Sequence, residues 1–474
     1  MKRAHHSDSN HGAISDSIAA TKIVTLPIDQ LTPYARNART HSKKQIRQIA
    51  DSMSRFGFTN PVLIDDRDMI LAGHGRVEAA KLLGLKVVPC IRLSAMSEAE
   101  KRAYVLADNK LALNAGWDEE VLATELQVLL EDVGQIDVSL TGFSVAEIDF
   151  LIDGGETGAI PPDDADDAIP PTVSSPVTQI GDVWLLGNHR LICGDARDAK
   201  SYEALMRRSD GSSDLAQMVF TDPPYNVRIG GNVSQSKRLA HREFLMASGE
   251  MAPDEFRQFL VETIEQLVAW STDGSIHYIC IDWRHMDVLS TAGRAAYSEL
   301  KNVVAWVKGH GGMGSFYRSR YELIFVFKNG NAPHINAFEL GQNGRTRTNV
   351  WNYRGINAST KAAREEVQLH PTVKPVAMVA DAMKDCSRRA GIILDPFCGS
   401  GTVLIAAQKT GRRARAMELD PIYCDTAIRR WQAFAVDDAI LEATGETFDA
   451  RHTAMTLASA RLDSDQLAAE EKSS

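Results

Sequence analysis

Strand-like and helix-like segments alternate over residues 177–450, and this alternation constrains the fold more than any other feature of the chain. Short apolar runs such as LAQMVF (215–220) and GIILD (391–395) are separated by longer segments with helical spacing, such as DEFRQFLVETIEQLVAW (254–270). Strands and helices that alternate in this way predict an α/β fold with a Rossmann-like doubly wound sheet. Ligands of such sheets bind beyond the carboxyl ends of the strands.

An acidic segment divides the chain, which at 474 residues is too long for one ordinary core. Residues 151–176 are rich in Pro, Gly and Asp and are predicted to form a self-repelling linker. A small domain with a helical extension is predicted before it, over 23–150, and the α/β domain follows over 177–450. The ends of the chain are predicted to be a disordered tail, 1–22, and a polar tail, 451–474.

Composition narrows the class of protein. No apolar run approaches the length of a membrane span, and the N-terminal residues lack the apolar stretch of a secretory signal. The six cysteines are scattered without a C-x-x-C pair, which indicates neither a disulfide framework nor a zinc site. We therefore expect a cytoplasmic protein that uses no metal.

The segment GIILDPFCGSGT is predicted to be a strand that ends at Asp395, followed by a glycine turn into a helix. Gly399 and Gly401 would let a ligand approach the backbone N–H groups at the helix N-terminus, a site that suits a carboxylate. Position 404 is Leu, so the third glycine of a dinucleotide-binding fingerprint is missing. The next strand ends in MELD, where Glu418 has the spacing of an acid that binds a ribose diol or, equally, of a cap on the next helix.

The strand that ends in MELD needs a neighbour, yet no further strand is predicted after it. The segment HRLICGDA, near the start of the α/β domain, can supply that neighbour, and Asp195 would then close a cofactor site against an adenine ring. This pairing predicts a circularly permuted order, in which the catalytic half of the domain precedes the cofactor half.

The segment MVFTDPPYNV (218–227) ends another predicted strand with a carboxylate, two prolines and an aromatic ring. Asp222 and the Pro223 carbonyl can both accept hydrogen bonds from an exocyclic amine, which draws its nitrogen toward tetrahedral geometry and frees its lone pair. Pro223 and Pro224 stiffen the turn, and Tyr225 offers a face to an unstacked base. The alternative is a Pro-rich turn without a chemical role.

Together these motifs identify residues 177–450 as similar to the amino-group DNA methyltransferases of the permuted β class. DPPY resembles their catalytic motif, DPFCGSGT their S-adenosylmethionine motif, and HPTVKP (370–375) the segment that lines the methionine end of the cofactor pocket. The resemblance implies a class I methyltransferase fold and methyl transfer to adenine N6 or cytosine N4 of a flipped base in double-stranded DNA. The Asp of DPPY leans toward adenine. The cofactor residues it implies are Asp195, Asp395, Phe397, Gly399, Gly401, Thr402, Glu418, Asp420, His370 and Lys374.

Contacts to DNA are expected from two basic clusters, although either could be only a solvated face. One follows the DPPY motif, and the other lies in a candidate target-recognition segment over about 329–368. The candidate DNA-binding residues are Arg228, Lys237, Arg238, Arg345, Arg347 and Arg354.

Residues 23–115 resemble the ParB-like nuclease and partition superfamily, which predicts a small α+β domain. The resemblance rests on LTPYARNARTHSKKQIRQIADSMSRFGFTNPVLID followed by ILAGHGRVEAAKLLGL. Gly73, His74, Gly75 and Arg76 form a turn into a helix N-terminus, which suits an anion such as the phosphate of a nucleotide. A purely structural helix start is equally compatible, because Gly75 stands where the superfamily commonly has Arg. Such fusions are typical of phage and prophage modification enzymes.

Three functional hypotheses follow from the sequence. The first is a site-specific adenine-N6 DNA methyltransferase, and the second is its cytosine-N4 counterpart. The third, of another class, is a ParB-like DNA-binding or nucleotide-dependent protein whose methylase half is not catalytic. The sequence reveals neither the recognition sequence nor the oligomeric state.

Overall fold

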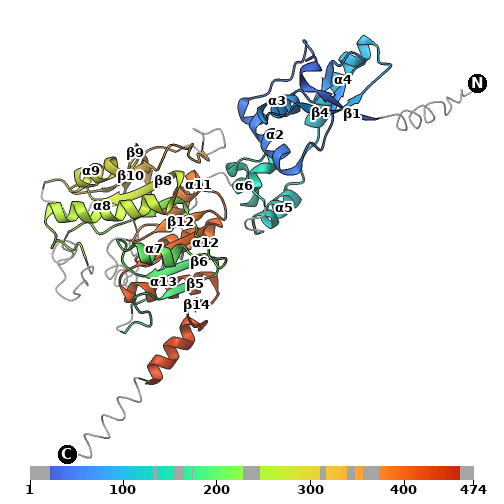
Figure 1. The fold of residues 1–474 in the computed structure, drawn as a ribbon. Coiled ribbons are helices and arrows are strands. Elements are labelled where there is room, and N and C mark those ends of the chain that lie inside the picture. The colour runs from blue at the N-terminus through green and yellow to red at the C-terminus, as the bar shows by residue number, and fades with distance from the viewer. Residues whose placement is uncertain are drawn as a thin grey trace, which may run out of the picture. The chain divides into compact units, whose positions relative to one another are not determined.

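The computed structural model describes residues 22–131, 136–153, 165–172, 175–227, 246–309, 316–338, 347–355 and 373–458. The chain forms two compact units, Met1–Ser144 and Val145–Ser474 (Figure 1). No helix among the described residues is both long enough and apolar enough to cross a bilayer.

The N-terminal unit is the small α+β domain that was predicted. Its sheet has the strand order β1-β4-β2-β3, and its core contains the buried side chains of Val62, Ile70 and Val88. In chain order its elements are β1 (Ile23–Pro27), η1 (Ile28–Gln30), α2 (Lys43–Phe56), β2 (Val62–Ile64), β3 (Ile70–Ala72), α3 (His74–Leu82), β4 (Val87–Arg92), α4 (Glu98–Leu113), α5 (Glu119–Glu131) and η2 (Val138–Thr141).

Helix boundaries in this unit follow local sequence signals. Helix α2 begins after Ser42, whose hydroxyl accepts from the Gln45 N–H, and α4 begins with a capping box between Ser97 and Glu100. Helix α3 begins after Gly73, whose φ of 100° lies in the left-handed region that glycine favours.

The second unit is a large sheet covered by helices. Among the described residues its strand order is β11-β9-β10-β8-β7-β12-β13-β6-β5-β14. In chain order its elements are α6 (Val145–Ile152), β5 (Val183–Leu186), β6 (His189–Cys193), α7 (Ala199–Met206), β7 (Ala216–Thr221), α8 (Pro253–Ala269), β8 (Ser271–Ile281), α9 (Met286–Ala296), β9 (Glu299–Val307), β10 (Tyr321–Lys328), β11 (Val350–Asn352), α11 (Val376–Cys386), β12 (Ile392–Asp395), α12 (Thr402–Thr410), β13 (Arg413–Glu418), α13 (Pro421–Ala435) and β14 (Ala439–Leu441).

The predicted doubly wound sheet is confirmed. Strands β8, β7, β12, β13 and β6 are parallel neighbours. One core lies under α11, α12 and α13, and a second core on the other face lies under α7, α8 and α9. The pairing predicted between the first and last parts of the unit is also present, because Glu418 of β13 lies opposite Cys193 of β6.

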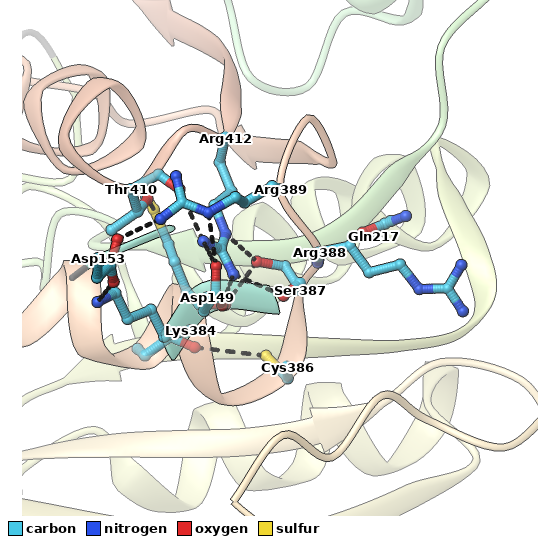
Figure 2. A network of polar contacts seen from close by, with 12 residues as sticks. Asp149, Asp153, Gln217, Lys384, Cys386, Ser387, Arg388, Arg389, Thr410 and Arg412 are labelled. Atoms are coloured by element: carbon cyan, nitrogen blue, oxygen red, sulfur yellow. Dashed lines mark hydrogen bonds and ion pairs between the residues drawn. The ribbon is translucent and has the colours of Figure 1, made fainter. Parts of the chain in front are cut away.

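Two described parts of the chain near the predicted linker pack on the second unit. Helix α6 belongs to this unit, and its Asp149 forms an ion pair with the fully buried guanidinium of Arg412, 2.8 Å away (Figure 2). Residues 165–172 follow, with Asp166 and Ile169 buried. The composition of 151–176 predicted a solvated chain, but in its described part Asp166 pairs with Lys409 of α12 and Asp153 with Lys384 of α11.

Candidate active site

The carboxyl ends of β7 and β12 lie side by side, although the two strands are far apart in the sequence. The Thr221 hydroxyl at the end of β7 donates to Asp395 Oδ1 at the end of β12 over 2.8 Å. One cavity opens beyond these ends, and it is lined by residues 222–225 after β7 and by residues 395–400 after β12. The DPPY motif and the glycine turn therefore contribute to a single site.

The glycine turn is shaped by two left-handed residues. Gly399 has a φ of 53° and Gly401 a φ of 86°. A Cβ at Gly401 would lie 3.0 Å from the Ala427 Cβ, so only glycine allows α12 and α13 to approach this closely. Thr402 begins α12, and its side chain faces the cavity.

Glu418 holds the glycine turn in place. Its Oε2 accepts from the Gly399 N–H over 2.8 Å, and its Oε1 accepts from the Asp420 N–H over 2.9 Å. Capping of α13 falls instead to Asp420, which accepts from the Ile422 N–H. Burial raises the pKa of Glu418 to about 7. The carboxylate lines the cavity with lone pairs to spare for a diol.

Asp395 and Asp195 differ in their relation to the cavity. Asp395 lines it and is buried, which raises its pKa to about 7, and its carboxylate also accepts from the Phe397 N–H over 3.1 Å. Asp195 instead pairs with the Arg197 guanidinium over 2.8 Å, while its neighbours Gly194 and Ala196 line the cavity. The structure thus places backbone, rather than the Asp195 carboxylate, at this wall.

Asp222 lies at the centre of a buried polar cluster. Its Oδ1 accepts from the Tyr225 hydroxyl, and its Oδ2 accepts from Lys374 Nζ. Lys374 is also 3.2 Å from Glu322 Oε2, and the other oxygen of Glu322 pairs with Lys308. Two carboxylates and two ammonium groups therefore alternate along one edge of the site.

The charges in this cluster set one another's protonation. Burial raises the pKa of Asp222; Lys374 opposes that shift, and Glu322 adds to it. Burial also raises the pKa of Glu322, but the charges of Lys374 and Lys308 lower it further, to about 2. The pKa of Lys374 is raised because Asp222 and Glu322 outweigh its burial. Glu322 and Lys374 are therefore charged at neutral pH, whereas the pKa of Asp222 stays above its ordinary value.

Sequence reasoning missed Glu322 and Lys308 and gave Lys374 another role. Glu322 lies near the start of β10 and Lys308 directly after β9. A charged residue at the end of an apolar strand usually indicates solvent, so neither residue signalled a buried site. Lys374, expected at the cofactor, lines the cavity and also holds Asp222.

Two of the candidate DNA-binding residues lie in the described part of the chain. Arg347 is partly buried: its guanidinium donates to Asp385 Oδ2 over 3.0 Å and to the Tyr353 hydroxyl over 2.8 Å, and it stacks on Trp351. These contacts give Arg347 a role in internal packing, and a phosphate contact remains a prediction. Arg354 is exposed. The other candidates, and the cofactor candidate His370, lie outside the described residues: Arg228, Lys237, Arg238 and Arg345.

The predicted anion site of the N-terminal unit is a helix start whose polar groups have internal partners. Arg76 donates to the carbonyls of Asn60, 2.7 Å away, and Pro61, 3.0 Å away. His74 Nε2 accepts from the Tyr34 N–H over 3.2 Å, and burial lowers its pKa. A Cβ on Gly75 would lie 3.1 Å from the His41 ring. The described contacts suit the structural alternative and leave anion binding as a prediction.

Comparison with known proteins assigns both units. The family model described as "DNA methylase" matches residues 216–429, the "ParB N-terminal domain" matches 13–110, and the "ParB-methyltransferase HTH domain" matches 120–180. The ParB-like nuclease domain-containing protein YnaK of Escherichia coli (strain K12) is 52% identical over 81 residues, which cover 17% of this chain and 93% of that protein. The chain is a ParB-type domain fused to a DNA methylase.

Relatives of the methylase unit are more distant. Type II methyltransferase M.ScaI of Streptomyces caespitosus is 37% identical over 92 residues, which cover 19% of this chain but only 30% of that enzyme. The crystal structure of the M1.HpyAVI–SAM complex is 17% identical and superposes with a TM-score of 0.34 over 46% of this chain and 89% of that one.

The residues of the cavity fit S-adenosylmethionine, the cofactor of this family. Glu418 offers a carboxylate to ribose hydroxyls, and the glycine turn brings backbone close to the cavity at the start of α12. Phe397 and Tyr423 add aromatic walls for a purine. The cavity then continues to Asp222 and Tyr225, so a donor and an acceptor would meet within it.

Proposed function

We propose that the protein transfers a methyl group from S-adenosylmethionine to the N6 amine of adenine in double-stranded DNA, at a specific sequence and after base flipping. The observation that carries the proposal is the single cavity lined by both Asp222 and the glycine turn. Bound S-adenosylmethionine supplies an electrophilic methyl group. Everything else required is positioning, which this rigid strand-end site can provide.

Asp222 and the Pro223 carbonyl would orient the target amine. Both oxygens of Asp222 already accept one hydrogen bond, from Tyr225 and Lys374, yet a carboxylate has about four acceptor sites and retains capacity for the amine. The charge of Lys374 lowers the pKa of Asp222 against the effect of burial, which favours the carboxylate form that can only accept hydrogen bonds. Tyr225 is fixed by its hydroxyl, which holds the ring beside the cavity.

The choice between adenine and cytosine rests on the first residue of the DPPY motif, where Asp222 favours adenine. Cytosine-N4 transfer is the alternative. The test is to incubate the protein with DNA and labelled donor, digest the DNA and separate the nucleosides. Label in N6-methyl-2′-deoxyadenosine supports the proposal, label in N4-methyl-2′-deoxycytidine selects the alternative, and the absence of label favours the non-catalytic ParB-like hypothesis.

A face for DNA is proposed at the same edge of the sheet. Strands β8 and β9 end at the edge where β7 ends, because β10 lies antiparallel between them. Phe316 and Tyr317, after β9, are 85% and 81% exposed with ring centroids 4.5 Å apart, and Arg318 and Arg320 follow. Exposed rings beside guanidinium groups are typical of surfaces that stack on bases and contact phosphates.

Replacing both rings, Phe316→Ala with Tyr317→Ala, is expected to weaken DNA binding about tenfold, since a stacked base contributes ~1–3 kcal/mol. Donor binding should stay unchanged. Fluorescence anisotropy with a labelled duplex at fixed salt measures the effect. Val436→Ala, an exposed site at the end of α13, is the control. DNA affinity equal to that of the parent would remove this face from the proposal.

Donor binding is expected to strengthen with pH because of Glu418. Its pKa is about 7 in the free protein, and the carboxylate form accepts the hydrogen bonds of a diol. Binding therefore lowers this pKa, and affinity should rise ~10-fold between pH 6 and pH 8. Calorimetric titration of the parent and of Glu418→Gln isolates the effect, since Asp395 remains in both proteins. Parallel pH profiles for the two proteins would contradict it.

Two finer points belong to the same proposal. A nucleotide at the start of α3 remains a prediction for the ParB-type domain, to be tested by equilibrium binding of labelled nucleoside triphosphates. A DNA substrate would locate the enzyme where bacterial or phage DNA is methylated, in the cytoplasm.

A further inference from the structure

Helix α11 is held at its C-terminal end by acidic residues from the segment that precedes the methylase sheet. Asp153, directly after α6, pairs with Lys384 in the last turn of α11 and with Arg389 beyond it (Figure 2). The Asp149 carboxylate of α6 accepts hydrogen bonds from both terminal nitrogens of Arg412, over 3.0 and 2.8 Å. These buried and partly buried ion pairs fix α6 beside the residues that lead into the amino ends of β12 and β13, whereas the cavity lies beyond the carboxyl ends.

The N-terminal end of α11 is held from the same segment. Helix α11 begins after Pro375, which offers no capping side chain of its own. Asp167 supplies the cap in its place, because its Oδ1 accepts from the Val376 N–H over 2.8 Å. A carboxylate at this position accepts from a backbone N–H that has no partner within the helix. Its negative charge also interacts favourably with the positive end of the helix dipole. Lys374, which holds Asp222, lies two residues before Val376.

Asp166 reaches the glycine turn through Arg430. The Asp166 carbonyl accepts from Arg430 Nη2 over 2.9 Å, and its carboxylate pairs with Lys409. The other terminal nitrogen of Arg430, which is buried, donates to the Ser400 carbonyl over 3.1 Å and lies 3.3 Å from Thr402 Oγ1. Thr402 Oγ1 in turn lies 3.4 Å from the Lys374 carbonyl. One polar chain thus joins Asp166, the glycine turn and the residue that holds Asp222.

We propose that Asp167 is a positioning residue for the donor pocket, and that residues 165–172 act as a strap that sets the first turn of α11 and the glycine turn together. Asp167 acts through the Val376 N–H on Lys374, and its neighbour Asp166 acts through Arg430 on Ser400 and Thr402. The identity of the ligand rests on the proposed function. The strap belongs to the stretch matched by the ParB-methyltransferase HTH model, so part of that stretch, within the second unit, also supports the cofactor site.

The test compares Asp167→Ala with Asp167→Asn in the full-length protein, using S-adenosylmethionine as the probe. Asparagine retains an oxygen that can cap α11, whereas alanine does not. We expect about a fivefold rise in the donor Kd for Asp167→Ala, a cost typical of a lost cap, and a Kd within about twofold of the parent for Asp167→Asn. The matched control, Asp153→Ala at the far end of α11, should lower the melting temperature and leave the donor Kd unchanged.

A donor Kd for Asp167→Ala equal to that of the parent would overturn the proposal, even if the variant melts at a lower temperature. Hydrogen exchange gives a readout that needs no ligand: amides of Val376 and of 400–402 should exchange faster in Asp167→Ala and not in Asp167→Asn. If the parent itself failed to bind the donor, the proposed function would fail, and hydrogen exchange alone would decide. Unchanged exchange at 400–402 would then reject the strap.

Discussion

Replacing Asp222 by alanine should lower methyl transfer to DNA by at least ~1000-fold, the scale expected when a preorganised polar group at the reacting centre is lost. The target amine would lose the acceptor that draws its lone pair toward the methyl group. Donor binding should change little, because Glu418 and the glycine turn remain. The measurement is a labelled-methyl transfer assay at saturating donor and DNA, paired with calorimetry of donor binding.

The fold of the Asp222→Ala variant should survive, since Lys374 keeps Glu322 as a partner 3.2 Å away. Asp254→Ala is the matched control: Asp254 is exposed at the start of α8, where it pairs with Arg257 at 3.1 Å. This control should retain full activity. Transfer by Asp222→Ala within about tenfold of the parent would exclude Asp222 from the chemistry.

Lys374→Met should produce the largest loss of stability in the methylase unit, ~3–5 kcal/mol near pH 8, because two buried carboxylates lose their shared cation. Glu322 keeps Lys308, but Asp222 keeps only the Tyr225 hydroxyl. The folded-state pKa of Asp222 is already raised in the parent, and without Lys374 it should rise further, while that of Glu322 should rise from about 2. Such a rise gives stability at low pH that is lost as the pH increases, so the deficit should shrink between pH 8 and pH 5.

Urea unfolding of the parent and of Lys374→Met at pH 5 and pH 8 tests this expectation. Lys301→Met serves as the control, because Lys301 pairs at the surface with Glu299 over 3.1 Å. Removing that exposed pair should cost less than ~1 kcal/mol at either pH. A deficit for Lys374→Met that is the same at both pH values would show that lost packing, and not unpaired charge, causes it.

The sheet and its ligand edge could be predicted because their signals are local. Thr221 and Asp395 each follow a short apolar run, and parallel strands necessarily end at one edge, so the DPPY motif and the glycine turn had to meet. The role of Gly401 could also be predicted, because a glycine between a strand and a helix suggests a left-handed backbone conformation in the turn. Pairing of β6 with β13 followed from the need to extend the sheet.

The charge pairing of the site could not be predicted in the same way. Arg347, Glu322 and Lys308 are partly buried against partners on other elements of the fold, and a charged residue in the sequence carries no mark of such pairing. The contacts of the acidic segment could not be predicted for a related reason. In the sequence Asp166 and Asp167 look like solvent-exposed acids. Their partners, Lys409, Arg430 and the Val376 N–H, lie more than 200 residues later and become neighbours only in the fold.

The pairing of β6 with β13, and of β14 with β5, has a consequence for biosynthesis. The earliest strands of the second unit, β5 and β6, pair with each other, but their other neighbours in the sheet are its last strands, β14 and β13, and β14 ends at Leu441. The ribosome must therefore release the chain through Leu441 before all strands of the sheet can pair. If the chain is cut between β6 and β13, each fragment should fold poorly alone. The complete sheet should form only when both fragments are produced together.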